Sequence, residues 1–257
     1  MRSDDPELAR ALLRLSRAAA AAIRAVYAEP FEARAKDDKS PVTDADEAAE
    51  KIITAGLKSL TPDFTIVAEE AMAAGDKPRL NGRPFWLVDP LDGTREFIKR
   101  NGEFTVNIAL IENGRATLGI VLLPVSGAAY LGTPQGARLF ADDADNQGRA
   151  ISARPMPADG ADVLVSRSHP DPAMEAWLKS QRIRREITAG SSLKFCRIAE
   201  GAADLYPRFA RISEWDTAAG QAVLEAAGGS VRDFEGRALL YGKPDFKNPP
   251  LIARGLD

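Results

Sequence analysis

The sequence predicts an α+β and α/β fold in which two N-terminal helices cover an antiparallel sheet and an α/β half follows. Three patterns support this: helical apolar spacing near the N-terminus, a succession of short strands up to residue 140, and alternating strands and helices after residue 160. The 257 residues suffice for one large domain or two modest ones. We expect an N-terminal α+β domain over residues 1–150 and a C-terminal α/β domain over residues 151–257.

Two amphipathic helices are expected at the N-terminus. Asp5 is placed to cap the first helix and Pro6 to occupy its first position. A capping box from Thr43 to Asp46 opens the second helix, and Thr61-Pro62-Asp63 ends it. The two apolar faces comprise Leu8, Leu12, Leu15, Ala19, Ile23 and Val26, and then Ala49, Ile53, Leu57 and Leu60.

Short apolar runs separated by turn residues then predict an antiparallel meander that packs on these helices. The stretch 141–160, rich in Asp, Ala, Pro and Gly, is interpreted as a domain boundary with a short strand over 150–152 embedded in it. The predicted strands of the meander cover residues 65–68, 85–88, 105–111, 117–122, 128–131 and 137–140.

The second half of the chain alternates between strand and helix patterns, which is typical of an α/β unit. Gly228-Gly229 provides a stop for the last helix. The predicted strands cover 163–166, 204–206 and 230–232, and the predicted helices 172–179, 193–200 and 216–227.

Composition excludes several classes of function. With 34 Lys and Arg against 37 Asp and Glu, the net charge of −3 gives no basic excess for a nucleic-acid polymer, although a single nucleotide stays possible. One cysteine, Cys196, indicates a reducing compartment, so we expect a cytoplasmic protein whose contact with the inner membrane is at most peripheral. No apolar run reaches the ~18 residues of a membrane span. With one histidine, any metal must be held by carboxylates.

The densest chemical signal is the segment from Trp86 to Thr94. An apolar strand runs directly into Asp89 and Asp92, with Pro90 restricting the backbone and Gly93 permitting a tight turn. Two converging carboxylates suit Mg²⁺, which prefers oxygen ligands and is often bound together with a phosphate. Backbone N–H groups after Gly93 would then cradle a phosphate oxygen. The alternative is an ordinary surface turn, because Asp, Pro and Gly are common turn formers.

Three further acidic sites, one of them a pair of residues, also have both a structural and a functional interpretation. Glu69-Glu70 ends an apolar strand, where paired acids are unfavourable unless they face water or a cation. Taken alone, Asp216 is explained as the N-cap of a helix, and Asp46 as a member of the capping box. None of these acids alone decides between structure and function.

Four motifs together resemble the Mg²⁺-dependent, lithium-sensitive inositol monophosphatase superfamily, over nearly the whole chain. They are Ser40-Pro41-Val42-Thr43-x-Ala45-Asp46, Glu69-Glu70, Trp86 to Thr94, and Trp215-Asp216-Thr217-Ala218-Ala219-Gly220. The resemblance implies the layered αβαβα sugar-phosphatase fold. Within the superfamily, the bacterial 3′(2′),5′-bisphosphate nucleotidases are the most similar, through residues 91–110, 165–169, 190–196 and 205–209.

The resemblance implies a cofactor of two or three Mg²⁺ ions. Glu69, Asp89 and the main-chain carbonyl of Leu91 would hold the first ion, and Asp89, Asp92 and Asp216 the second, with a weaker third near Glu69. Metal-bound water would attack phosphorus. The catalytic set implied by the resemblance comprises Asp46, Thr94 and Glu69, with the Thr94 hydroxyl, oriented by Asp46, holding that water.

The resemblance also implies that the N-terminal domain (1–150) binds the metal and that the C-terminal domain (151–257) determines substrate specificity. Lys194 and Arg208 would contact the non-reacting phosphate or the ribose, with solvent-exposed cations as the alternative. His169 is either a nucleotide contact or a structural residue, and Ser191 and Ser192 precede a helix where capping and phosphate binding need similar geometry. The implied substrate-binding set comprises Gly93, Thr94, His169, Ser191, Ser192, Lys194, Arg208 and Asp216.

The activity implied is hydrolysis of the 3′-phosphate of adenosine 3′,5′-bisphosphate (PAP) to AMP and phosphate in sulfate assimilation, with its sulfated precursor PAPS as an additional candidate substrate. The partner is then a small nucleotide, and the protein is a monomer or a homodimer. Two alternatives remain: an inositol or sugar monophosphatase with the same metal core, and a non-catalytic nucleotide-binding module.

Overall fold

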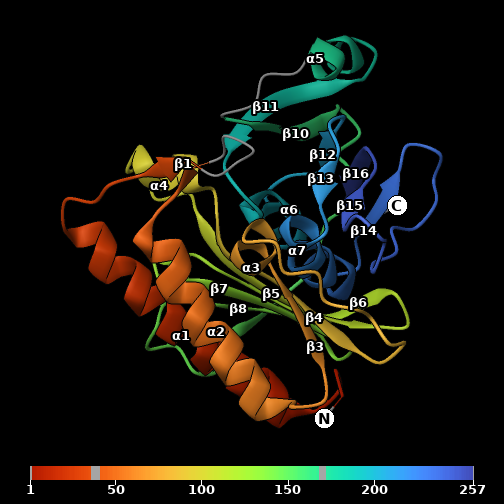
Figure 1. Cartoon of the computed structure of the whole chain (residues 1–257). Helices are drawn as coiled ribbons and strands as arrows, with labels where there is room; N and C mark the ends of the chain where they lie inside the picture. Colours follow the sequence, from red (N-terminus) through yellow and green to blue (C-terminus); the bar gives the residue numbers. More distant parts are fainter. Residues whose placement is uncertain (1, 36–40, 168–171, 257) are drawn as a thin grey trace.

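The computed structural model describes residues 2–35, 41–167 and 172–256 and shows helices and sheets stacked in layers (Figure 1). Helices α1 and α2 cover one face of a seven-stranded sheet, and α6 and α7 lie between this sheet and a five-stranded one. Helix α5 packs on the outer face of the second sheet. This αβαβα order confirms the fold class expected from the sequence. The helices are α1 (Pro6–Ala28), α2 (Asp44–Leu60), α3 (Glu69–Ala73), α4 (Thr94–Ile98), α5 (Pro172–Lys179), α6 (Leu193–Ala199) and α7 (Trp215–Ala226).

Local capping starts the two N-terminal helices where the sequence predicts. The Asp5 side chain accepts a hydrogen bond from the backbone N–H of Glu7, one residue beyond Pro6. At the start of α2, Thr43 and Asp46 form the predicted capping box. The side chains that both helices bury meet one face of the first sheet, as Leu12 and Ile53 do beside Trp86 of that sheet.

The first sheet has the strand order β3-β4-β5-β6-β7-β8-β9. Strands β3 and β4 are parallel and all later pairs are antiparallel, so the expectation of a fully antiparallel meander is wrong for the first pair. The reason is α3, which returns the chain between β3 and β4 and aligns their carboxyl ends. The strands are β3 (Thr65–Ala68), β4 (Phe85–Asp92), β5 (Thr105–Glu112), β6 (Arg115–Leu122), β7 (Ala129–Thr133), β8 (Gly136–Phe140) and β9 (Arg149–Ile151).

Two short helices that the sequence did not indicate follow β3 and β4. Glu69 and Glu70, expected as the end of a strand, form the first turn of α3. Helix α4 starts at Thr94 after Gly93, whose φ of 93° requires the left-handed region that glycine adopts readily. Because β3 and β4 are parallel, Glu69 and Thr94 lie at the same edge of the sheet.

The second sheet has the order β11-β10-β12-β16-β14, with parallel pairing around β10 and antiparallel pairing around β16. Strands β11 and β16 were not predicted. Strand β9, near the expected embedded strand, belongs to the first sheet. The remaining strands are β1 (Arg34–Ala35), β2 (Pro41–Val42), β10 (Ala161–Ser166), β11 (Ile183–Ala189), β12 (Leu205–Arg208), β13 (Ile212–Ser213), β14 (Ser230–Asp233), β15 (Lys247–Asn248) and β16 (Leu251–Arg254).

One apolar core spans the chain between the two sheets. Leu87 and Val121 of the first sheet belong to the same buried cluster as Phe195 and Val223 of α6 and α7. The division into domains at residue 150 therefore stays a prediction, since this core contains side chains from both sides of it.

Helix α7 lies on the first sheet at two glycines. Gly119 of β6 and Gly132 of β7 are paired across the strands. A Cβ atom at Gly119 would lie 2.6 Å from the carbonyl oxygen of Ala219, and one at Gly132 2.4 Å from that of Ala222. Only a residue without a side chain lets the helix backbone approach the strands so closely.

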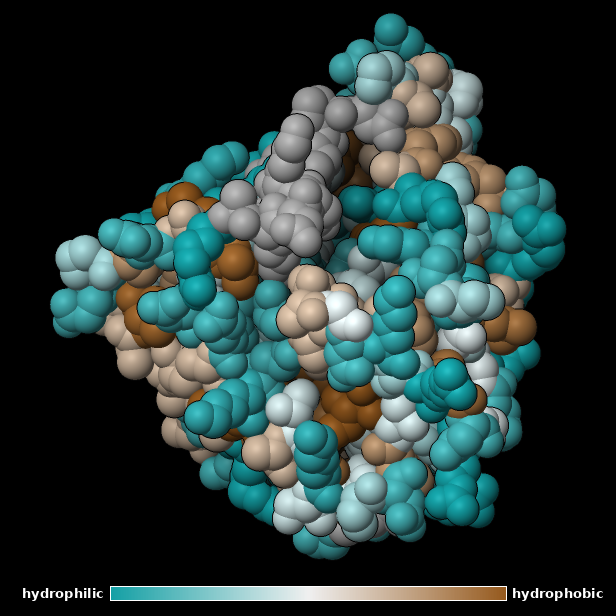
Figure 2. All heavy atoms as spheres, in the orientation of Figure 1, coloured by the Kyte–Doolittle hydropathy of each residue, from teal (hydrophilic) through white to brown (hydrophobic). Residues whose placement is uncertain are grey.

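The surface is mixed. Figure 2 shows hydrophilic side chains over most of the face in view, with apolar residues scattered between them. Among the helices that the structure describes, none combines the length and the apolar character needed to cross a membrane.

Candidate active site

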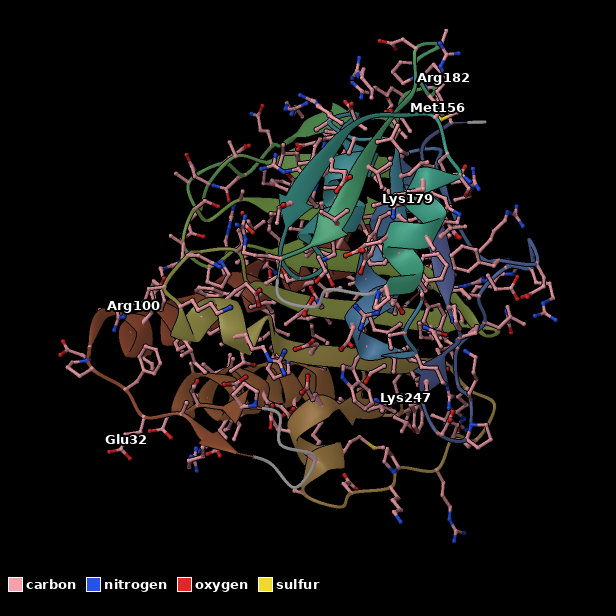
Figure 3. All side chains as sticks on the ribbon, turned by 90° about the horizontal axis from the view of Figure 1, so that it is seen from above. Glu32, Arg100, Met156, Lys179, Arg182 and Lys247 are labelled. Atoms are coloured by element: carbon pink, nitrogen blue, oxygen red, sulfur yellow. The ribbon has the colours of Figure 1, made fainter. Side chains whose placement is uncertain are left out.

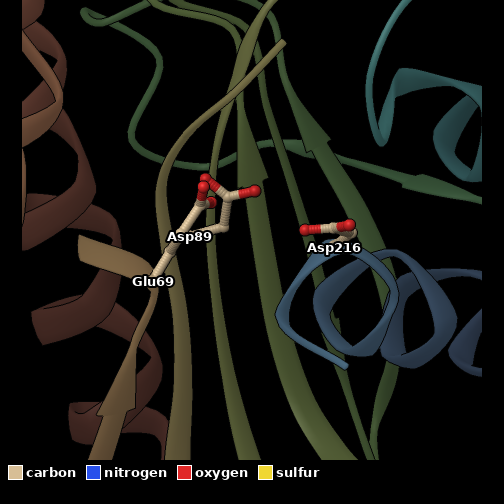
Figure 4. Close-up of side chains that lie close together, drawn as sticks. All are labelled: Glu69, Asp89 and Asp216. Carbon is tan, nitrogen blue, oxygen red and sulfur yellow. The ribbon is translucent and has the colours of Figure 1, made fainter. Parts of the chain in front are cut away.

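Three carboxylates from separate elements meet near the carboxyl ends of the first two strands, β3 and β4, of the first sheet (Figure 4). Glu69 begins α3, Asp89 lies in β4, and Asp216 is the second residue of α7. One oxygen atom from each lies within 4.8 Å of the others. Asp89 is buried, with 1% of its surface exposed. The structure thus brings together three of the predicted metal ligands, from both halves of the chain.

A bulge in β4 turns Asp92 toward the same side as Asp89. Residues three apart in a regular strand face opposite sides of the sheet. Here Asp89 pairs with Asn107 and Asp92 with Thr105, so β4 contains one residue more than β5 over this interval. Pro90 lies within the bulge, where its missing N–H does no harm. The backbone N–H of Leu91 donates to Asp89 Oδ1 at 3.0 Å, which orients that carboxylate.

The environment of the carboxylates favours a cation. Burial raises the pKa of Asp89 well above its ordinary value, and the charges of Glu69, Asp92 and Asp216 raise it further. Burial likewise raises the pKa of Asp216, with added repulsion from Asp92 and Glu69. Carboxylates this close together ionise fully only beside positive charge. A set made of hard carboxylate oxygens, held by the fold, fits Mg²⁺.

Asp46 serves both as a cap and as a partner of Thr94. Its Oδ2 atom accepts hydrogen bonds from the backbone N–H and the hydroxyl of Thr43, each at 2.7 Å. Its Oδ1 atom accepts from the Thr94 hydroxyl at 3.2 Å. Both interpretations of Asp46 are therefore compatible. The Thr94 hydroxyl uses its hydrogen atom in this bond, so its oxygen lone pairs can accept a hydrogen bond from water.

Asp92 is tied to the second half of the chain through Ser192. Its Oδ2 atom accepts from the backbone N–H of Ser192 at 2.6 Å and lies 2.8 Å from the Ser192 hydroxyl. That hydroxyl also lies 2.7 Å from the carbonyl oxygen of Asp216 and accepts from Asn107 Nδ2 at 2.9 Å. Burial raises the pKa of Asp92, while Lys194 and these hydrogen bonds lower it. Ser192 is 1% exposed and engaged within the protein, so the structure places it behind the pocket wall, away from the expected substrate contact.

A pocket of about 240 Å³ opens beside the carboxylates. It includes Glu69, Asp92, Gly93, Thr94, Ser191, Lys194, Arg208 and Asp216, all of them predicted site residues. Asp46, Asp89, Leu91 and Ser192 lie behind this lining, and His169 lies outside the described residues. The lining also includes eight residues to which the sequence analysis assigned no role in the site: Pro41, Arg95, Glu96, Ser166, Gly190, Phe195, Tyr206 and Ile212.

The wall opposite the carboxylates carries polar groups and two cations. Lys194 is 4% exposed and donates to the carbonyl oxygen of Ser191 at 2.7 Å, with its ammonium 5.1 Å from the centre of the Tyr206 ring. Lys194 is therefore a buried cation of the site. Within the described part of the chain, Arg208 Nε and the Ser191 hydroxyl are buried without a hydrogen-bond partner. These two groups can bind a polar ligand in the pocket.

One further cation, Lys247, lies near the site and belongs to the C-terminal segment. Lys247, labelled in Figure 3, donates to the Ser213 hydroxyl at 2.7 Å and lies 5.9 Å from the centre of the Trp215 ring. Its charge lowers the pKa of neighbouring Asp216, against the dominant effect of burial. Sequence reasoning missed Lys247, because its spacing from Asp216 carries no local pattern.

Glu103 was also missed, although it holds a wall of the pocket. Its Oε2 atom accepts from the backbone N–H of Gly190 at 2.9 Å, and Arg167 pairs with the same carboxylate at 3.0 Å. A Cβ atom at Gly190 would lie 2.7 Å from the Glu103 carbonyl oxygen. Only the glycine before Ser191 hinted at such a close approach.

The fold and this site define the class of protein. The chain belongs to the inositol monophosphatase family, which its sequence matches over residues 4–254. The resemblance inferred from the four motifs and the prediction of a phosphatase are both confirmed by this match and by the relatives within the family.

Several of those relatives carry the same name. The chain is 47% identical to the 3′(2′),5′-bisphosphate nucleotidase CysQ of Salmonella typhimurium over 238 residues, which cover 91% of this chain and 94% of that protein. Identity to CysQ of Escherichia coli K12 is 46% over the same coverage. The crystal structure of CysQ from Bacteroides thetaiotaomicron has a TM-score of 0.81 and 34% identity, covering 98% of each chain. An inositol monophosphatase from Zymomonas mobilis follows with a TM-score of 0.79 and 28% identity, covering 99% of this chain and 95% of that one.

Proposed function

We propose that the protein is a Mg²⁺-dependent 3′(2′),5′-bisphosphate nucleotidase that hydrolyses the 3′-phosphate of PAP to give AMP and phosphate. The observation that carries the proposal is the pairing, in one pocket, of clustered carboxylates with two cations, the buried Lys194 and the half-buried Arg208. A substrate with two phosphates needs both walls: one phosphate reacts at the carboxylate side and the other is neutralised opposite. The CysQ name of the relatives supports the same substrate.

In this proposal Glu69, Asp89 and Asp216 hold the metal, with the Leu91 carbonyl and Asp92 completing its surroundings. When bound, Mg²⁺ supplies positive charge that acidifies water and neutralises charge on the phosphate oxygens. Either two or three ions fit the proposal, and their number is an expectation from the resemblance.

The chain's own groups orient the attacking water. Thr94 donates to Asp46 and so presents a lone pair to a water molecule in the pocket. As that water attacks phosphorus, its proton moves toward the Thr94 oxygen and the threonine proton toward Asp46. Asp46 can receive it through the hydrogen bond that already joins the Thr94 hydroxyl to its Oδ1 atom, while the two bonds from Thr43 to Oδ2 hold the carboxylate in place.

The opposite wall recognises the remainder of the nucleotide. Arg208 Nε and the Ser191 hydroxyl offer donors to the non-reacting phosphate, and Lys194 adds charge behind them. Gly93 turns the backbone at the reacting phosphate without a side chain in the way. Contact with His169, activity on PAPS, a role in sulfate assimilation and a cytoplasmic location belong to this proposal as expectations.

The test is phosphate release from PAP, PAPS, inositol 1-phosphate and fructose 1,6-bisphosphate, each with Mg²⁺ and with excess EDTA. We expect PAP to be hydrolysed with the highest kcat/KM and EDTA to abolish turnover. A clear preference for inositol 1-phosphate would favour the alternative of a sugar or inositol monophosphatase. Full activity in EDTA would contradict the metal-dependent mechanism, and nucleotide binding without turnover would indicate a non-catalytic module.

A further inference from the structure

Helix α3, which carries Glu69, receives its N-terminal cap from another helix. Glu50 of α2 is 8% exposed, and its two carboxylate oxygens accept the backbone N–H groups of Glu70 at 2.7 Å and Ala71 at 2.9 Å. These are the second and third residues of α3, whose N–H groups lack partners inside the helix. The residue at the N-cap position, Ala68, has no side chain that can cap.

Helix α3 is short and only partly buried, with Ala71 and Met72 packed against the apolar cores. Helix α3 has five residues, and none of them is buried. A helix so short has no stability of its own, so its orientation depends on contacts from outside. The hydrogen bonds from the backbone N–H groups of Glu70 and Ala71 to Glu50 join the first turn of α3 directly to α2.

The geometry of Glu69 follows from this cap. Glu69 is the residue after β3, directly before the two N–H groups that Glu50 holds. Strand β3 lies at the edge of the sheet and fixes Ala68 opposite Val88, one residue before Asp89. Glu50 then fixes the turn by which the backbone leaves β3, and with it the direction of the Glu69 side chain.

One turn of α2 therefore faces two parts of the site. Asp46 and Glu50 are four residues apart and lie on the same side of the helix. Asp46 orients Thr94, while Glu50 orients the first turn of α3. Both are buried in a helix that packs firmly on the sheet, which makes α2 a rigid support for both.

We propose that Glu50 is a positioning residue that fixes the Glu69 carboxylate against Asp89 and Asp216 and so sets the affinity of the site for Mg²⁺. The inference rests on the proposed metal-dependent function, which it extends to a residue that touches neither metal nor substrate. A residue that only stabilised the fold would change the melting temperature and leave the affinity of the folded protein for Mg²⁺ unchanged.

The test compares Glu50→Gln and Glu50→Ala with the wild type after removal of divalent ions. Gln keeps the length of the side chain but replaces one acceptor oxygen with a donor, whereas Ala removes both acceptors. We expect the Mg²⁺ dissociation constant, measured by titration calorimetry, to rise by about tenfold in Glu50→Gln and further in Glu50→Ala. At saturating Mg²⁺, the KM for PAP should stay within about twofold of wild type, because Glu50 lies outside the pocket.

Asp233→Asn is the matched control. Asp233 is 5% exposed and also accepts two backbone N–H groups, from Glu235 at 3.0 Å and Arg237 at 2.8 Å, away from the site. Its loss should lower the melting temperature while the Mg²⁺ affinity stays at the wild-type value.

Two results would overturn the inference: unchanged Mg²⁺ affinity in folded Glu50→Gln, or an equal loss of affinity in Asp233→Asn. If Glu50→Ala does not fold, Glu50→Gln alone decides. A wild-type protein that binds Mg²⁺ but hydrolyses no substrate would instead overturn the proposed function, and the calorimetric comparison would still test Glu50.

Discussion

At the scale of single residues, the site depends on side chains with more than one bonding partner. Asp46 caps α2 and orients Thr94, and Asp92 faces the pocket while holding Ser192 of the other half of the chain. Such residues cannot be sorted into structural and functional groups. A substitution is informative only when folding and metal affinity are measured together with turnover.

Asp89 offers the clearest test of the metal site. Asp89→Asn keeps the size of the side chain and removes a buried negative charge that four acidic neighbours oppose. We expect Mg²⁺-dependent hydrolysis of PAP to be abolished while the metal-free variant stays folded, because an amide is a poor Mg²⁺ ligand beside carboxylates. Phosphate release and the circular dichroism spectrum provide the two measurements. Wild-type turnover in the variant would refute the assignment of Asp89.

Thr94 tests the orientation of water separately from metal binding. Thr94→Ala removes the hydroxyl that bonds to Asp46, so we expect kcat to fall by about 10²-fold with the Mg²⁺ dissociation constant nearly unchanged. Thr94→Ser keeps the hydroxyl and should retain most of the activity. Steady-state kinetics and calorimetry on both variants would show the difference. Equal losses in the serine and alanine variants would mean that the hydroxyl has no part in the reaction.

At the scale of elements, success of sequence reasoning depended on whether the signal was local. Helices α1 and α2 begin at caps encoded by neighbouring residues, and β4 runs into its motif as expected. Helix α3 was not predicted because its cap comes from Glu50, which is 20 residues away along the chain. Strand β11 was not predicted because its charged sequence, Ile183 to Ala189, lacks an apolar run, as suits an exposed edge strand.

The same reasoning applies to the site. The β4 segment with Asp89 and Asp92 is continuous in sequence, so its role could be inferred from type and spacing. Contacts such as Glu103 with Gly190, 87 residues apart, are set by packing and leave no pattern in the sequence. The buried state of Lys194, at 4% exposure, depends on how α6 packs between the sheets.

The edge of the second sheet is held by an ionic cluster around Asp162 of β10. Its carboxylate is fully buried and bonds to Arg184 at 2.8 Å, Arg185 at 2.9 Å and Arg154 at 2.8 Å. Hydrogen bonds from Arg184 first, and then from Arg185 and Arg154, hold the pKa of Asp162 far below its ordinary value, against the opposing effect of burial. These contacts join β10 to the predominantly polar edge strand β11.

Asp162→Asn should lower the free energy of unfolding by about 2–3 kcal/mol at pH 7, less than for a fully buried pair because the arginines are partly exposed to water. A carboxylate with a lowered folded pKa stabilises above its unfolded pKa and loses that effect as the pH falls. The gap between wild type and variant should therefore be constant above about pH 5 and narrow below about pH 4. Urea unfolding over this pH range, with the exposed Asp63→Asn as control, measures it. A gap that widened in acid would contradict this account.

At the scale of the whole molecule, the proposed metal site joins parts that are distant in the sequence. Glu69 and Asp89 belong to the edge of the first sheet, and Asp216 to the helical layer between the sheets. A bound cation would therefore link two layers of the fold, and its binding energy would add to the stability of their packing.

Removal of divalent ions should consequently lower the melting temperature as well as the activity. At a Mg²⁺ concentration about 100 times the dissociation constant, the added stability is about 2.7 kcal/mol. For a chain of this size this corresponds to a rise in melting temperature of roughly 5–10 °C. Differential scanning calorimetry with EDTA and with Mg²⁺ measures the shift, which should vanish in Asp89→Asn. An equal shift in that variant would place the stabilising ion elsewhere.

The glycine pair under α7 bears on which ion the protein selects. Gly119 and Gly132 set the height of α7 above the sheet, and Asp216 lies one turn before the first of those contacts. Mg²⁺ accepts oxygen ligands only near about 2.0–2.1 Å, whereas Ca²⁺ accepts about 2.3–2.6 Å. A single methyl group at Gly132 would lift the helix and widen the gap between Asp216 and Asp89. The two glycines therefore set the distance between the Asp216 and Asp89 carboxylates, and this distance would determine which ionic radius fits between them. A longer distance would favour the larger cation, Ca²⁺.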